Sequence, residues 1–379
     1  MNQETDSASI FSITIGLNAA IIAVRALTPM VLEVHLPQDV HGDHKKPQDP
    51  VHPDAEAGAA SSAASSSPEP QAAQKSAIIN DLQASLPFGP FEPARHRTLE
   101  AGLRGWVRRQ TGLRLGYVEQ LYTFGDRGRR IEAQESDLHE VSIGYLALTQ
   151  LAEETEDGPG GQLERFGGRW RSWYSHFPWE DWREDRPALL DAQLLPALRK
   201  WAASAPDDGN RPLSPMQRLR LSFGIDGAVW DEERVLERYE LLYEAGLVLE
   251  HYRDRGETPP PDSLLLGQPM QMDHRRILAT AISRLRSKLK YRPVIFELLQ
   301  DSFTLTQLQE TVEAISGRHL HKQNFRRLVE QGQLVEPTGA TSTRTGGRPA
   351  KLYRFRRSVL VERPAPGLRF GSANKMDAS

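Results

Sequence analysis

Five polar and basic residues cluster near the C-terminus, and their side chains are of the kinds that read nucleic acids. They are Lys322, Gln323, Asn324, Arg326 and Arg327. Glutamine and asparagine pair bidentately with adenine, arginine pairs with guanine, and both lysine and arginine neutralise phosphates. The sequence leaves open which of these side chains contacts bases and which contacts phosphates. Asn324 could equally be a hydrogen-bonding residue of a helix turn.

The residues around this cluster, 292–370, have the element order of a winged helix. Thr304 and Gln307 have capping-box spacing at the start of one helix, and Gly317 is typical of its end. A further helix over about 321–331 would bury three apolar residues and expose the polar cluster. We expect this helix to enter a DNA major groove.

A basic hairpin is predicted next, with strands at 333–337 and 350–356 and a loop over 338–349. Its candidate DNA-contacting cations are Arg344, Arg348 and Lys351. A flexible cationic loop suits a minor groove, where arginine is attracted by the negative potential. The alternative interpretation of these residues is a solvated hairpin tip.

Charge is distributed unevenly along the chain. Residues 284–370 hold 17 Lys and Arg against 7 Asp and Glu, a net charge of +10, whereas the whole chain has −3. An acidic body therefore carries a basic end, which favours double-stranded DNA as the partner. A basic winged helix that binds protein remains the alternative.

Composition sets the broad class. A chain of 379 residues predicts two or three domains, and 39% hydrophobic residues with seven tryptophans are enough for real cores. The lack of cysteine excludes a disulfide framework and any thiolate site. Glu4 and Asp6 at the N-terminus do not fit a signal peptide, and the apolar run 10–24 is too short for a membrane span. We therefore expect a cytoplasmic protein without a membrane partner.

The first 150 residues predict one domain of mixed strands and helices. Strands are expected at 10–24, 29–36, 118–124 and 141–148, and a helix at 98–110. Residues 37–77 are rich in Ala, Ser and Pro and predict a disordered loop.

Residues 151–268 form a tryptophan-rich accessory region, with five tryptophans between 170 and 201. Packing into a compact subdomain is favoured over a stacking platform for bases. Helices are expected at 188–203 and 232–245. A connecting helix over 269–291 would lead into the winged helix, and a disordered tail over 371–379 would follow it.

A resemblance arises from Leu86-Pro-Phe-Gly89 and from a helix that ends Gln110-Thr-Gly-Leu113. This outline resembles a Nudix domain, a family that hydrolyses nucleoside diphosphates linked to another group. Its glutamates, in the pattern G-x5-E-x7-R-E-U-x-E-E-x-G-U, hold Mg²⁺ ions that bridge a pyrophosphate. In this sequence Arg109 and Gln110 stand where two of those glutamates belong, and Trp106 replaces another. We therefore predict no catalytic residue and no metal site.

The whole arrangement resembles the Nudix-related transcriptional regulators of NAD metabolism, of the type that represses NAD synthesis in alphaproteobacteria. The stretches that carry the match are Tyr117–Asp126, Asp273–Arg275, Arg284–Arg286, Tyr291–Leu299, Phe303–Leu305, Asn324–Arg326 and Gly347–Tyr353. The resemblance implies a homodimer on a palindromic operator. It also implies an effector such as NAD, ADP-ribose or ATP in the former enzyme pocket, with no cofactor required.

The effector residues expected from this resemblance follow the strand at 118–124. They are Phe124, Gly125, Asp126, Arg127 and Arg129. The glycine-containing loop and its cations could meet phosphates, although an ordinary surface turn explains the same residues.

The expected fold class is mixed α+β and α/β, a Nudix-like α/β/α sandwich followed by a winged helix-turn-helix domain. The expected function is repression of NAD biosynthesis genes by a protein that is not an enzyme. One alternative is an active Nudix pyrophosphohydrolase that uses other carboxylates, such as Glu100, Glu132 and Glu135. The other is a winged-helix scaffold that binds protein.

Overall fold

The computed structural model describes residues 12–35, 84–125, 138–151, 163, 167–206, 211–342 and 349–368. The loop expected at 37–77 and the tail expected at 371–379 lie outside these ranges, as do Glu132 and Glu135. Within them, every helix is too short or too polar to span a bilayer.

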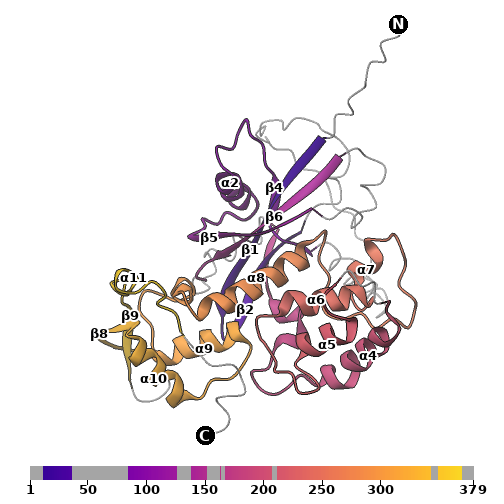
Figure 1. Cartoon of the computed structure of the whole chain (residues 1–379). Helices are drawn as coiled ribbons and strands as arrows, with labels where there is room; N and C mark the ends of the chain where they lie inside the picture. The colour runs from indigo at the N-terminus through magenta and orange to yellow at the C-terminus, as the bar shows by residue number, and fades with distance from the viewer. Residues whose placement is uncertain are drawn as a thin grey trace, which may run out of the picture.

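A mixed sheet of seven strands forms the centre of the body (Figure 1). Its main path runs β3-β2-β1-β6-β5, while β4 pairs with β1 and β7 pairs with β2. The strands are β1 (Ser12–Arg25), β2 (Thr28–His35), β3 (Ala84–Ser85), β4 (Phe88–Pro90), β5 (Tyr117–Phe124), β6 (Leu138–Leu148) and β7 (Gly168–Ser172). β1 and β6 are parallel and the other pairs are antiparallel. β1, β2, β5 and β6 confirm the four strands expected at 10–24, 29–36, 118–124 and 141–148.

Both faces of the sheet are covered by helices. Leu17, Ala19 and Ile21 of β1 belong to one apolar cluster, and Ala20 and Ile22 belong to the other. This alternation follows from the two-residue period of a strand. Helix α2 (Leu99–Thr111) covers the first face and helix α8 (His274–Leu289) covers the second. The expected α/β/α sandwich is confirmed.

Local signals place α2 where the sequence predicts a helix. The Thr98 hydroxyl accepts a hydrogen bond from the Ala101 amide at the N-terminus. Gly112 ends the helix with φ 72°, a conformation that glycine adopts without strain. Leu103 and Val107 point to the sheet and are fully buried.

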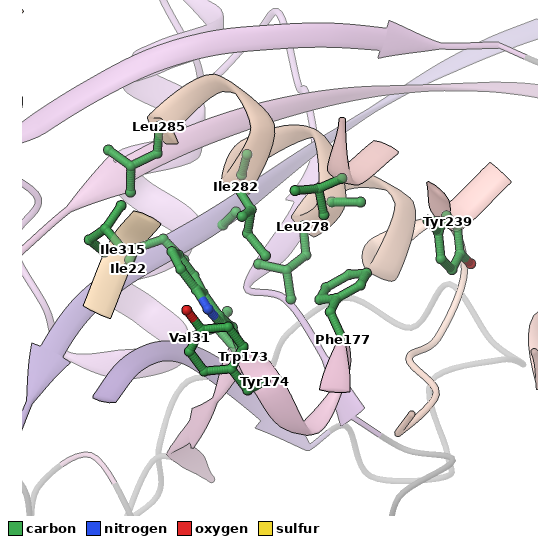
Figure 2. Close-up of a cluster of buried hydrophobic side chains, with 14 of the residues drawn as sticks. Ile22, Val31, Trp173, Tyr174, Phe177, Tyr239, Leu278, Ile282, Leu285 and Ile315 are labelled. Carbon is green, nitrogen blue, oxygen red and sulfur yellow. The ribbon is translucent and has the colours of Figure 1, made fainter. Parts of the chain in front are cut away.

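The tryptophan-rich region packs into the body rather than forming a core of its own. β7 joins the sheet beside β2, and Trp173 lies in the same cluster as Ile22 and Val31 of the sheet and Leu278 of α8 (Figure 2). The helices of this region are η3 (Trp173–Ser175), η4 (Pro178–Glu180), η5 (Leu190–Leu194), α4 (Leu195–Ser204), α5 (Pro215–Phe223), α6 (Val235–Glu244) and α7 (Leu249–Arg253). Helices this short bury little apolar surface by themselves. The apolar side chains of the tryptophan-rich region therefore pack against the sheet and α8.

The C-terminal elements have winged-helix order. They are η6 (Val294–Leu298), α9 (Leu305–Ser316), α10 (Lys322–Gly332), β8 (Val335–Ser342), β9 (Ala350–Phe355) and α11 (Val359–Glu362). The capping box of Thr304 and Gln307 is present. β8 extends to Ser342, five residues beyond the expected strand end, because its pairing with β9 continues after a bulge. An isolated antiparallel β-bridge pairs Phe303 with Tyr353 of β9, a contact that the sequence did not predict.

A buried carboxylate on β2 ties the sheet to the tryptophan-rich region. Glu33 is fully buried and accepts hydrogen bonds from His176 at 2.9 Å, Arg169 at 2.7 Å and Arg171 at 3.1 Å. Burial alone raises the pKa of the Glu33 carboxyl, but the bond and charge of His176 and the bond from Arg169 outweigh it. The net result lowers the pKa of Glu33 to about 2.

Acid should therefore weaken the fold partly through Glu33. Since its pKa falls from 4.5 to about 2 on folding, its stabilisation is present above about pH 4.5 and is lost as pH falls towards 2. The shift corresponds to a loss of about 3 kcal/mol in the free energy of unfolding. Urea denaturation across this pH range should give a steeper pH dependence for the parent than for Glu33→Gln. Glu100→Gln, at an exposed glutamate, is the control and should keep the pH dependence of the parent. Equal pH dependence in the parent and in Glu33→Gln would contradict the role of Glu33.

Candidate nucleic-acid interface

One face of α10 presents the residues expected to contact DNA. Lys322, Gln323, Arg326 and Arg327 are exposed, while Phe325 and Val329 on the opposite face are buried. Asn324 is half-buried, and its Oδ1 lies 3.4 Å from the Arg327 guanidinium. The helix thus holds two arginines, a lysine and a glutamine on one exposed surface, as the amphipathic pattern predicts.

The hairpin continues this polar surface only in part. Lys351 is exposed on β9, whereas Arg344 and Arg348 lie outside the described residues. Two further exposed cations follow that the sequence reasoning did not select, Arg354 on β9 and Arg357 just after it. Arg354 is paired with Glu336 at 2.6 Å. These residues could have been found by extending the basic run of the hairpin by a few positions.

Part of the basic charge counted in the sequence does not reach the surface. Arg286 is buried against Glu180 at 2.6 Å, and Lys288 pairs with Glu119. Lys290 and Arg318 both approach Glu232. The charge asymmetry of the chain therefore reflects internal pairing between the body and its C-terminal end as well as an exposed cationic face.

The α2 face that carries glutamates in an active Nudix helix makes structural bonds instead. The Gln110 amide donates to the Phe88 carbonyl at 2.8 Å and accepts from the Phe88 amide at 3.0 Å. Trp106 donates to the Pro90 carbonyl at 2.9 Å and lies so close to Gly89 that a Cβ there would collide with its ring. The Arg109 guanidinium lies 4.0 Å from the centre of the same ring.

Carboxylates do not replace the missing glutamates in the part of the chain that is described. No group of three or more His, Asp or Glu side chains there could hold a metal ion. Glu100, one alternative carboxylate, is exposed and paired with Arg104 at 2.8 Å.

Gln110→Glu tests this structural role directly. A glutamate can accept from the Phe88 amide but, when ionised, cannot donate to the Phe88 carbonyl. We expect the free energy of unfolding at neutral pH to fall by about 1–3 kcal/mol, measured by urea denaturation. Gln120→Glu, at an exposed position of β5, is the matched control and should change the free energy of unfolding little. An unchanged stability in Gln110→Glu would show that the paired bonds contribute nothing.

Two of the expected effector residues are described, and they differ in exposure. Gly125 is exposed, whereas Phe124 is only 3% exposed and its ring lies under the Arg276 guanidinium, 4.9 Å away. Tyr122 packs edge-on against Phe124 and is 63% exposed, an aromatic surface that the sequence reasoning did not select. Asp126, Arg127 and Arg129 lie outside the described residues.

A surface groove of about 570 Å³ lies elsewhere, beside α9. It is lined by Leu27, Asp181, Arg183, Glu184, Asp185, Arg186, Pro187, Glu310 and Glu313. Burial and the neighbouring Glu313 charge raise the pKa of Glu310. The groove shares none of the expected effector residues, and we assign it no ligand.

The C-terminal elements belong to a known class of domain. Residues 295–355 match the family model of a DNA-binding winged helix domain. The particular family is the NrtR DNA-binding winged helix domain. This part of the chain is therefore an NrtR-type winged helix.

A curated relative from Acinetobacter baylyi (strain ATCC 33305 / BD413 / ADP1) is described as an ADPR responsive transcriptional repressor, NtrR. It is 40% identical over 86 residues, which are 23% of this chain. The match spans 34% of the relative's own length, about a third.

Solved structures with a similar outline include NrtR from Shewanella oneidensis in complex with a 27mer DNA. It has a TM-score of 0.45 and 17% identity, covering 92% of this chain and 95% of that one. A MutT/nudix family protein from Enterococcus faecalis has a TM-score of 0.43 and 13% identity, covering 93% and 90%. The Nudix domain of S. oneidensis NrtR with ADP ribose has a TM-score of 0.25 and 14% identity, covering 45% and 79%.

Proposed function

We propose that this protein represses transcription of NAD biosynthesis genes by binding their upstream DNA. The observation that carries the proposal is the exposed face of α10, with Lys322, Gln323, Arg326 and Arg327, inside a winged helix of the NrtR type. A helix with such a surface fits a major groove, where its cations meet phosphates and its amide and guanidinium groups meet base edges.

The operator we propose is palindromic and is bound by a homodimer. A two-fold dimer would place two copies of α10 about one helical turn of DNA apart, near 34 Å. Asn324, Lys351, Arg344 and Arg348 are further candidates for contacts with this DNA. The description of the A. baylyi relative as a transcriptional repressor supports DNA as the partner.

The Nudix-like body is proposed to sense a nucleotide without hydrolysing it. The α2 positions that would hold Mg²⁺ carry Gln110, Trp106 and Arg109, all engaged in bonds or ring contacts with β4 or with each other. An ADP-ribose type of effector is favoured, because the A. baylyi relative is described as ADPR responsive. Phe124, Gly125, Asp126, Arg127 and Arg129 remain the proposed contacts, and a ligand stacked on Phe124 would have to displace Arg276.

Fluorescence anisotropy with labelled duplex from upstream of NAD-synthesis genes tests the proposal, with and without ADP-ribose, NAD or ATP. We expect binding that weakens steeply with salt and changes with one of the nucleotides, because an effector shifts an equilibrium through its different affinities for the two states. A parallel assay of ADP-ribose with Mg²⁺ should show turnover at background only. Absence of DNA binding at low salt would refute the repressor, and clear turnover would favour the hydrolase.

A further inference from the structure

The C-terminal end of α9 is held by donors from the tryptophan-rich region and α8. The Tyr174 hydroxyl donates to the Ala314 carbonyl at 2.8 Å, and the Trp182 amide donates to the Gly317 carbonyl at 2.7 Å. The Arg286 Nε donates to the Ile315 carbonyl at 2.9 Å. The last four carbonyls of a helix have no partner within it, so groups outside α9 satisfy its end. We call Tyr174, Glu180, Trp182 and Arg286 the α9 socket.

The contact between the α9 socket and α9 leaves no spare room. Gly317 ends α9 with φ 73°, and a Cβ there would lie 2.5 Å from the Glu180 carbonyl oxygen and 2.7 Å from the Arg286 guanidinium. Ile315 of α9 also lies in the same apolar cluster as Trp173 and Ile282 (Figure 2). The winged helix therefore shares a continuous core with the body.

Buried charge makes this contact specific in orientation. Glu180 is 1% exposed and accepts from Arg238 at 2.5 and 2.8 Å and from Arg286 at 2.6 Å. Arg286 also donates to the Glu232 carbonyl at 3.0 Å. These bonds fix the Arg286 guanidinium in the position from which its Nε donates to the Ile315 carbonyl. Tilting α9 would leave that buried Nε and the Ile315 carbonyl without partners, which is costly.

We propose that the tryptophan-rich segment 173–182, together with Arg286, positions the winged helix for DNA by holding α9 in one orientation. This inference rests on the proposed DNA-binding function and gives a role to a region that had none. α8 connects Phe124 to the α9 socket. It carries Arg276, which lies over Phe124, and Arg286, which lies about 15 Å further along the same helix.

Spin labels can measure the orientation directly, because the chain has no native cysteine. Ala101→Cys on α2 and Gln331→Cys on α10 are both exposed. The doubly labelled full chain, diluted into excess unlabelled chain, should give one narrow distance distribution by double electron–electron resonance. Tyr174→Phe removes a single donor and keeps the ring, and we expect it to broaden the distribution.

DNA affinity should fall as the spin-label distance distribution broadens. If the competent orientation falls to about a tenth of the population, the apparent Kd rises about tenfold. The salt slope of binding should stay unchanged, because the phosphate contacts themselves are intact. Tyr243→Phe is the matched control, since it removes the Tyr243–Asp254 hydrogen bond elsewhere in the body, and it should alter neither readout.

A broad distribution in the parent, or a Tyr174→Phe variant with parental width and affinity, would overturn the positioning role. If Tyr174→Phe does not fold, Gly317→Ala tests the same contact from the side of α9 and should also broaden the distribution. Broadening in a protein that binds no DNA would uphold the α9 socket and refute the repressor, so the two failures are distinguishable.

Discussion

The double substitution Arg326→Ala/Arg327→Ala should weaken binding to operator DNA about a hundredfold at low salt. Both side chains are exposed on the same surface of α10, where each can contact a phosphate or a guanine edge. A contact of either kind contributes about 1–3 kcal/mol, so two together give a loss of this size. The slope of log K against log salt should fall by about 0.9 for each phosphate contact that is removed.

Arg97→Ala/Arg108→Ala is the matched control for this measurement. It removes the same charge from exposed positions at and just before α2, at a distance from the winged helix in sequence and fold. We expect its affinity and salt slope to match the parent in the same anisotropy titrations. A similar loss in both variants would mean that net charge alone drives binding. Parental affinity in Arg326→Ala/Arg327→Ala would show that α10 is not the DNA interface.

Glu180→Ala is expected to lower the free energy of unfolding by about 3–5 kcal/mol. Glu180 is the shared acceptor of two fully buried arginines, Arg238 and Arg286. Without its carboxylate both guanidinium groups would stay buried with no opposite charge between them. Urea denaturation with linear extrapolation measures the loss, provided that the parent and the variant have the same m-value.

Glu244→Ala is the control for Glu180→Ala. Glu244 also accepts from two arginines, Arg211 and Arg218, but its side chain is 26% exposed. Water can solvate the arginines left behind, so we expect a loss of about 0–1 kcal/mol. Equal small losses in the two variants would mean that water reaches Glu180 and that its carboxylate does not hold Arg286 rigidly at the end of α9.

Structural features that depend only on neighbouring residues were predicted well from the sequence. The capping box of Thr304 and Gln307, the glycine that ends α9 and the amphipathic period of α10 all appear in the structure as expected. The helix expected at 98–110 is α2, which the Thr98 cap and Gly112 bound. These features depend on hydrogen bonds and side-chain spacing within one or two helical turns, which the order of residues encodes directly.

The candidate site was predicted only as far as such local patterns extend. The exposed face of α10 follows from periodicity, whereas the burial of Phe124 under Arg276 does not, because these residues are about 150 positions apart. The contacts proposed for Arg344, Arg348, Asp126, Arg127 and Arg129 lie outside the described residues and stay predictions.

By itself, the sequence predicted several of the helices, the residues on the exposed face of α10 and the residues that stand where a Nudix helix would carry its glutamates. Only the tertiary structure decided that Gln110 bonds to β4, that β7 joins the sheet and that the tryptophans pack against the body. It alone revealed that Glu180 and Arg286 meet at the end of α9. Such partners are brought together by the burial of apolar surface between distant segments, and residue spacing carries no record of which segments will meet.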